Sequence, residues 1–205
     1  MITVRRFKRI EALLIEAGYS ELIEWSETVS APKDADEFAE HTVFVICNSG
    51  MANRVAAPIS ERCISALREG RSAATEFGHP GKRKAIDQIW AWRGPLYAMY
   101  LGSTQKLEFL ATLPWIGPVT CYHLAKNLGA EFAKPDVHME RLARRDKTTT
   151  HKLCAKLAKA TGYRVGTIDT VLWRACADRL LDSQAYERDG WKAAFKPGPF
   201  RESYI

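Results

Sequence analysis

The stretch LPWIGPVTCYHLAKNLGAEFAKPDVHMERLARR, residues 113–145, carries the strongest local signal in the chain. Pro114 ends a helical segment, and Pro118 stands at the start of the next one. Proline is accepted in the first turn of a helix, and Gly117 between the two prolines permits a positive φ. The pattern predicts a tight helix-hairpin-helix over residues 104–128.

A turn of this kind leaves the N–H groups at the start of its second helix without partners inside the helix. Together with the helix dipole, these groups can hold a DNA phosphate, a contact that senses the backbone and ignores base sequence. The alternative is an αα-hairpin that only packs, and a single turn motif does not separate the two interpretations.

Asp136 stands behind Pro135 and just before an amphipathic segment. An aspartate in this place can accept hydrogen bonds from the first N–H groups of a helix and so cap it. A carboxylate presented there could also stabilise an oxocarbenium-like sugar or orient an attacking water molecule. The two roles are compatible.

Helical periodicity recurs along almost the whole chain, whereas alternating strand patterns and Asn-Gly turns are missing. Both observations predict an all-α fold. Gly18, Gly70, Gly129 and Gly162 each follow an apolar periodic segment, where a left-handed glycine would end a helix. The predicted helices span residues 4–17, 19–27, 35–47, 52–68, 82–91, 105–113, 119–128, 137–144, 150–161 and 168–181.

No internal repeat or low-complexity linker divides residues 1–205, so we expect one catalytic unit built from two lobes. One lobe would contain about residues 40–133, including the hairpin. The other would contain about residues 1–39 plus 134–205, with a cleft where the chain crosses. The terminal KPGPFRESYI is expected to pack as an irregular tail.

The chain has 205 residues, of which 46% are hydrophobic, enough for a sizeable core. Its net charge of +6 favours an anionic partner, although a surplus of this size also occurs in proteins that touch no nucleic acid. No apolar run approaches the roughly 18 residues that span a bilayer, and the amphipathic N-terminal segment lacks a signal-peptide cleavage pattern. We expect an intracellular protein of the cytoplasm, associated with the nucleoid.

The turn LPWIGPVTC, followed by a helix and KPDVHMERLA, resembles the helix-hairpin-helix Gly/Pro…Asp superfamily of DNA glycosylases. PDVHMERLARR is especially similar to the segment after the hairpin in 8-oxoguanine glycosylases. The specific likeness covers about residues 104–145, and a weaker one extends to VFVICNSGMANRVAAPISERC, residues 43–63. The resemblance implies a two-lobed helical glycosylase fold with a DNA-binding cleft, and it makes Asp136 the catalytic residue.

Val119 departs from part of that superfamily. Members that also cut the strand carry a lysine two residues after the hairpin glycine, and this lysine attacks C1′ to form a Schiff base. Lys126 lies about two turns further along the helix, and Lys134 matches no family nucleophile. We therefore expect a monofunctional glycosylase that uses water and leaves an abasic site, as in base excision repair.

The resemblance also implies DNA contacts in the hairpin and in the segment after Asp136. A lone histidine is often a packing residue, and sequence does not show which arginine of this segment faces DNA. The expected contacts are Trp115, Gly117, Val119, Thr120, His138 and Arg141.

A glycosylase must fill the gap that a flipped base leaves in the stack. The loop CNSGMANR, residues 47–54, aligns with the region that does so in the superfamily. Asn48, Ser49 and Met51 are candidates for the intrusion, and Asn53 or Arg54 could touch the opposite strand. The alternative is a plain helix connection with a capping Asn or Ser.

The five cysteines are an odd, widely spaced set, which encodes neither a disulfide framework nor a zinc site. They are expected to be buried thiols. The four-cysteine cluster of endonuclease III and adenine glycosylases is absent, so no iron–sulfur cluster is expected and no cofactor should be required. By resemblance, an alkali or alkaline-earth ion could bind the backbone carbonyls of Ala111, Leu113 and Ile116 and assist DNA binding.

The expected partner is double-stranded DNA containing a modified base, bound by a monomer with no membrane involved. Two other functions remain open. One is a different reaction at a hypermodified base of phage-type DNA, because one fold can host several chemistries. The other is a non-catalytic helix-hairpin-helix module in which Asp136 is only a cap. No residue pattern identifies the base.

Overall fold

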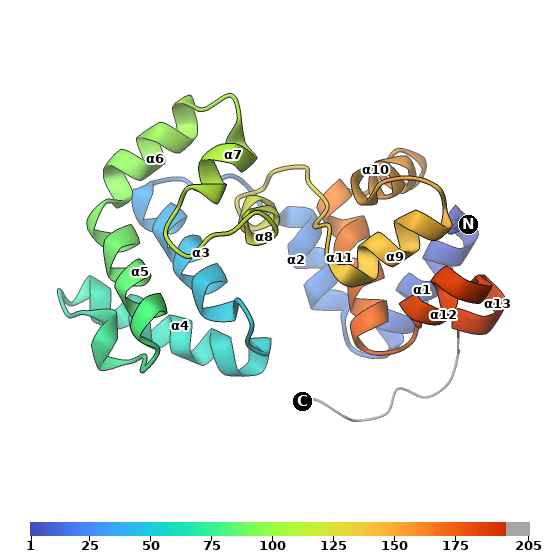
Figure 1. The fold of residues 1–205 in the computed structure, drawn as a ribbon, viewed down its shortest axis with the longest axis horizontal. Helices are drawn as coiled ribbons and strands as arrows, with labels where there is room; N and C mark the ends of the chain where they lie inside the picture. The colour runs from blue at the N-terminus through green and yellow to red at the C-terminus, as the bar shows by residue number, and fades with distance from the viewer. Residues whose placement is uncertain (196–205) are drawn as a thin grey trace. The chain divides into compact units, whose positions relative to one another are not determined.

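Figure 1 shows the computed structural model of the chain, which describes residues 1–195. These residues form helices α1 to α13 and the 3-10 helix η1, with no strand beyond an isolated bridge between Leu181 and Phe195. The all-α class predicted from helical periodicity is confirmed. The tail at residues 196–205, expected to pack irregularly, lies outside the described part of the chain.

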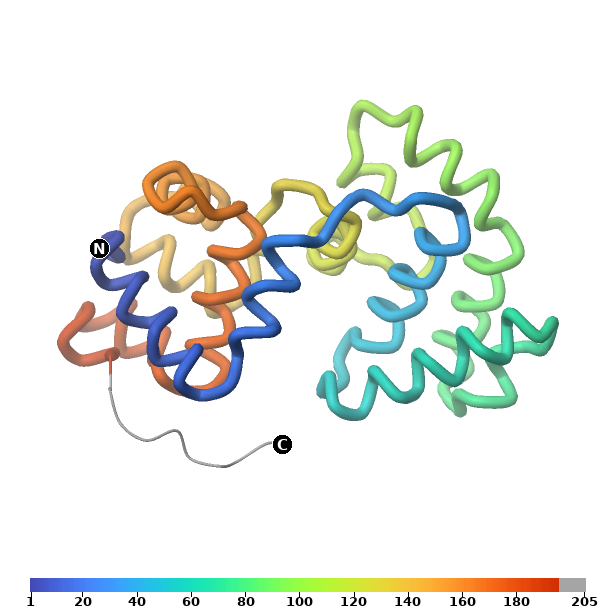
Figure 2. Tube along the Cα trace, turned by 180° about the vertical axis from the view of Figure 1, so that it is seen from behind, coloured from blue at the N-terminus to red at the C-terminus, as the bar shows by residue number. Residues whose placement is uncertain are grey.

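The chain forms two compact units. Of the described residues, unit 1 contains 1–29 and 131–195, and unit 2 contains Ser30–Ala130 (Figure 2). From the sequence we predicted that the chain passes from one lobe to the other near residue 40, which lies inside a helix. In the structure the boundary between the units lies between Val29 and Ser30, before that helix begins at Ala35. The physical reason is that this helix, α3, is buried on most of its faces within unit 2 and cannot be shared.

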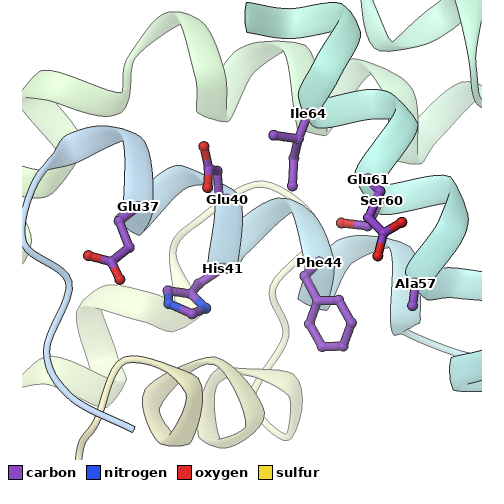
Figure 3. A pocket seen from close by; sticks show the side chains of 8 residues that line it. All are labelled: Glu37, Glu40, His41, Phe44, Ala57, Ser60, Glu61 and Ile64. Carbon is purple, nitrogen blue, oxygen red and sulfur yellow. The ribbon is translucent and has the colours of Figure 1, made fainter.

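Unit 2 is built around α3, which packs against α4, α5, α6 and α8. Asp34 begins α3 by accepting a hydrogen bond from the N–H of Glu37 at 2.8 Å, and Phe38 and Ile46 are fully buried. A hollow of about 310 Å³ lies between α3 and α4, with His41 among its lining residues (Figure 3). The helices are α3 (Ala35–Asn48), α4 (Asn53–Arg68), η1 (Ala73–Thr75), α5 (Pro80–Ala91), α6 (Arg93–Gly102), α7 (Lys106–Ala111) and α8 (Thr120–Asn127).

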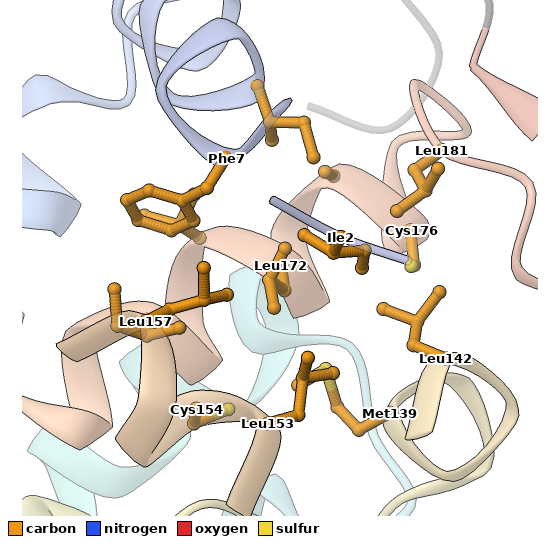
Figure 4. Packing of buried hydrophobic residues seen from close by; sticks show 14 of the residues in the cluster. Ile2, Phe7, Met139, Leu142, Leu153, Cys154, Leu157, Leu172, Cys176 and Leu181 are labelled. Atoms are coloured by element: carbon orange, nitrogen blue, oxygen red, sulfur yellow. The ribbon is translucent and has the colours of Figure 1, made fainter. Parts of the chain in front are cut away.

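Unit 1 is built around α11, which packs against α1, α2, α9 and α10. Its sequence explains this place, because Ile168, Val171, Leu172 and Ala175 recur at helical spacing and are all fully buried. Figure 4 shows the core around Leu172. The helices are α1 (Val4–Glu16), α2 (Ser20–Thr28), α9 (Val137–Arg145), α10 (Thr150–Thr161), α11 (Val165–Ala177), α12 (Ser183–Asp189) and α13 (Trp191–Ala194).

The prediction that left-handed glycines end four helices is confirmed, since φ lies between 75° and 88° at Gly18, Gly70, Gly129 and Gly162. The helix predicted over residues 168–181 is instead α11, and the chain leaves it with Arg179 at a positive φ of 59°.

Helices α6, α12 and α13 were not predicted. Helix α6 begins RGPL, and its Gly94 and Pro95 argue against a helix when they are considered by residue type. Pro95 nevertheless lies in the first turn, where no N–H is needed for an intrahelical bond.

Candidate functional site

The hairpin lies in unit 2, between α7 and α8. The N–H of Ile116 donates to the carbonyl of Leu113 at 3.0 Å, and the N–H of Cys121 donates to that of Gly117 at 2.9 Å. Two details of the predicted turn are wrong. The positive φ of 66° belongs to Trp115 and not to Gly117. Helix α8 begins at Thr120, after the proline that was expected to open it.

Trp115 adopts this left-handed backbone because its side chain is held by packing. Such a conformation costs a bulky residue on the order of 1–3 kcal/mol. The ring lies so close to Gly81 that a Cβ there would come within 2.5 Å of it, and its centroid is 5.2 Å from that of His79. The indole N–H donates to the hydroxyl of Ser49 at 3.1 Å. Trp115 is nevertheless 44% exposed, so part of the ring remains available to a ligand.

The start of α8 has no side-chain cap. Val119 is the N-cap residue, and its exposed side chain carries no hydrogen-bonding group. The first N–H groups of a helix have no acceptors inside it, and here the N–H of Cys121 is already bound to Gly117, so the N–H groups of Val119 and Thr120 are the ones that the phosphate-binding interpretation uses. The phosphate contact itself, at Val119 and Thr120, stays a prediction.

The predicted wedge loop joins α3 to α4 within the same unit. Asn48 donates from its side-chain amide to the side-chain oxygen of Asn53 at 2.8 Å, and the N–H of Met51 donates to the carbonyl of Asn48 at 3.0 Å. Asn53 and Arg54 are exposed at the start of α4. Through the hydroxyl of Ser49, the structure brings this loop together with the hairpin tryptophan.

Asp136 lies in unit 1 as the N-cap residue of α9. Its Oδ1 accepts hydrogen bonds from the N–H groups of His138 at 2.9 Å and Met139 at 3.0 Å. The capping role is therefore confirmed. Its Oδ2 makes no hydrogen bond within the described residues, and the side chain is partly exposed. One oxygen holds the helix, and the other is available for chemistry.

The segment before Asp136 is held by two other carboxylates of unit 1. Asp169 on α11 is only 1% exposed and accepts the N–H of Lys134 at 3.2 Å. Glu131 accepts a hydrogen bond from Nε of Arg164 at 2.6 Å. These bonds restrain the backbone on the N-terminal side of Asp136, so the aspartate is presented from a fixed position.

The other candidates after Asp136 contact α12. Nδ1 of His138 lies 2.8 Å from the hydroxyl of Ser183, which is buried at the start of that helix. Nε of Arg144 lies 2.7 Å from one carboxylate oxygen of Glu187, and Nε of Arg141 lies 3.8 Å from the other. Both arginines are therefore oriented by one glutamate, and a DNA contact by His138 or Arg141 stays a prediction.

The nucleophiles available in these segments are limited. Val119 offers no amine at the start of α8. Cys176, close to Asp136, is buried, and burial raises the pKa of its thiol, with the Asp136 carboxylate raising it further. A thiol held in its neutral form is a poor nucleophile.

Residues 1–195 contain no group of three or more His, Cys, Asp or Glu side chains placed to hold a metal ion. The five cysteines are all buried and free, as predicted. At the hairpin, the carbonyl of Leu113 accepts one hydrogen bond, and a carbonyl oxygen has a second lone pair. The ion on Ala111, Leu113 and Ile116 stays a prediction.

Within the described part of the chain, no helix is both long and apolar enough to cross a membrane.

Sequence reasoning assigned no role to two buried charged residues that support the candidate segments, Asp169 and Lys82. Each shares a helix face with buried apolar residues: Asp169 with Leu172, and Lys82 with Ala85 and Ile89. This spacing was the signal that could have found them, because a charge on the apolar face of a helix needs a specific partner.

No family model and no curated protein matches this sequence. Among solved structures, the chain is similar to the crystal structure of the 8-oxoguanine DNA glycosylase of Thermotoga maritima, with 19% sequence identity and a TM-score of 0.54. The match covers 93% of this chain and 97% of that one. The chain therefore shares the fold of that solved glycosylase structure, which agrees with the all-α class that the sequence predicted.

Proposed function

We propose that this protein is a DNA glycosylase that removes a damaged or modified base from duplex DNA by hydrolysis, without cutting the strand. The observation that carries the proposal is the geometry of Asp136, which caps α9 with Oδ1 and leaves Oδ2 without a hydrogen bond in the described residues. The glycosylase fold supports the same assignment.

In this proposal the base is flipped from the stack and the loop at residues 47–54 fills the gap. As the bond from C1′ to the base breaks, its electron pair leaves with the base nitrogen and the sugar becomes oxocarbenium-like. Oδ2 of Asp136 stabilises that positive charge or orients the water molecule that attacks C1′. The water oxygen bonds to C1′ and gives up one proton, the departing base nitrogen gains one proton, and the products are the neutral free base and an abasic site.

Water is proposed as the nucleophile because Val119 stands where strand-cutting relatives carry a lysine. Its aliphatic side chain is 43% exposed and cannot form a Schiff base. The DNA backbone would be held by the uncapped start of α8 and by the segment that begins α9. We propose that the protein acts as a monomer and needs no cofactor.

The test uses a panel of duplexes that each carry one modified base. An 8-oxoguanine duplex comes first because the Thermotoga protein is named for that base. Strand breaks that appear only after heating in alkali would support hydrolytic excision. Breaks without alkali, or a protein–DNA adduct trapped by borohydride, would contradict it. Tight binding to DNA with no excision from any duplex would favour the non-catalytic module.

A further inference from the structure

Lys82 on α5 is a lysine that is only 4% exposed. Its ammonium group donates to the backbone carbonyls of Cys47 at 3.0 Å and Ser49 at 2.6 Å, and it lies 5.7 Å from the ring centre of Phe77. Within residues 1–195 it has no carboxylate partner. Burial lowers the pKa of this ammonium, so a lysine here is costly and its two hydrogen bonds must offset that cost.

The two carbonyls lie on either side of Asn48, the last residue of α3. The final carbonyls of a helix have no partners inside it, and a cation near them also complements the helix dipole. Ser49 has left the helix, with an extended backbone at φ −61° and ψ 115°. The ammonium of Lys82 therefore binds the backbone on both sides of the point where α3 ends.

Other contacts hold the same loop. Ser49 is bound twice, through its carbonyl by Lys82 and through its hydroxyl by the indole N–H of Trp115. The ring of Trp115 in turn rests on Gly81, the residue before Lys82. Two adjacent residues of α5, Gly81 and Lys82, thus contact the hairpin tryptophan and the loop to which it is bonded.

We propose that Lys82 is a positioning residue for the loop at residues 47–54, keeping it in the shape that fills the gap left by a flipped base. This inference rests on the proposed function and deepens it. Lys82 would touch neither the DNA nor the reacting sugar, and its effect would pass through the carbonyls of Cys47 and Ser49.

The first measurement needs no DNA. Amide hydrogen exchange over residues 47–54 should be faster in Lys82→Met, which keeps the length of the side chain and removes its donors. Lys82→Arg should restore part of the protection, because the guanidinium can donate to the same carbonyls. Lys84→Met is the matched control, since Lys84 is exposed on the same helix. Unchanged exchange in Lys82→Met would overturn the proposal.

The second measurement compares two duplexes that differ by one tetrahydrofuran abasic analogue. The wild type should prefer the abasic duplex, because the loop can enter its gap. Lys82→Met should reduce this preference about tenfold, as expected for two lost hydrogen bonds, and leave binding of the intact duplex unchanged. Equal weakening on both duplexes would indicate a purely structural role and overturn the proposal.

If Lys82→Met fails to fold, Lys82→Gln, whose shorter amide cannot span the same distance to both carbonyls, is measured in its place, and the same faster exchange and loss of preference are expected. A wild type with no preference for the abasic duplex would count against the proposed function. The exchange measurement would still decide whether Lys82 holds the loop, so the two failures are distinguishable.

Discussion

Replacing Asp136 by asparagine separates its capping role from its proposed catalytic role. Asparagine keeps an oxygen acceptor for the N–H groups of His138 and Met139 and loses only the negative charge. A charge at a helix N-terminus contributes about 0.3–1 kcal/mol, so the free energy of unfolding should fall by no more than about 1 kcal/mol. For a chain of this size that corresponds to a loss of about 2–4 °C in Tm. Asp136→Ala also removes the acceptor and should cost about 0.5–2 kcal/mol.

The excision rates of the two variants should not differ in the way that their stabilities do. Neither variant has a charge to stabilise the sugar, so the single-turnover excision rate should fall at least about 100-fold in both, equivalent to about 2.7 kcal/mol in the barrier. The assay is alkali-revealed strand cleavage of the duplex on which the wild type is most active, with thermal unfolding measured in parallel.

Asp182 provides the matched control for Asp136. It caps α12 in the same unit, and its Oδ1 accepts the N–H groups of Gln184 and Ala185, each at 3.0 Å. Asp182→Asn should therefore show the same small loss of stability with no loss of rate. Retention of the excision rate in Asp136→Asn to within about threefold of wild type would refute the catalytic assignment and leave only the cap.

Three further changes test other parts of the structure. Val119→Lys places an amine at the start of α8 and should form a covalent adduct with abasic DNA that borohydride traps. The adduct would be seen as a shifted band on a denaturing gel. Absence of the band would indicate that this position does not face C1′. Burial lowers the pKa of His41 despite the neighbouring glutamates, so below the ordinary value of 6.5 the unfolded state binds more protons than the folded state. The free energy of unfolding should therefore fall as the pH drops through 6.5, and urea titrations of His41→Gln should show a weaker dependence of that free energy on pH. The same pH dependence in the variant as in the wild type would contradict this prediction. Gly129→Ala would bring a Cβ within 2.5 Å of the carbonyl carbon of Ser30 and should destabilise unit 2 by more than about 1–2 kcal/mol. The control is Gly162→Ala, which has a similar φ but no atom within 4 Å of the new Cβ, so it should cost only the backbone strain. Equal losses of stability in urea unfolding would show that the close contact at Gly129 can relax.

Features that depend on neighbouring residues in the chain could be predicted from the sequence. The glycine stops follow from φ preferences, and the cap at Asp136 follows from the N–H groups that any helix start leaves open. Helical periodicity gave most of the elements and the all-α class, and the fold was confirmed by comparison with a solved structure.

Features that depend on distant packing could not be predicted. Trp115 takes the positive φ that was expected at Gly117, because its ring finds a flat surface at Gly81 and a hydroxyl at Ser49. No rule about glycine or proline in turns contains that information. The contact between Lys82 and the end of α3 likewise joins segments far apart in sequence, and spacing alone could show only that Lys82 would be buried.

The close approach of Gly129 to Ser30 also bears on how the protein is made. Ser30 is the first residue of unit 2 and Gly129 is next to its last, so unit 2 is an insertion whose two ends meet. It can fold from one contiguous stretch as it leaves the ribosome, whereas α1 and α2 must wait for α9 to α11. Once folded, unit 2 holds the two halves of unit 1 near each other, which replaces a long flexible loop by a short one and lowers the entropy cost of their joining.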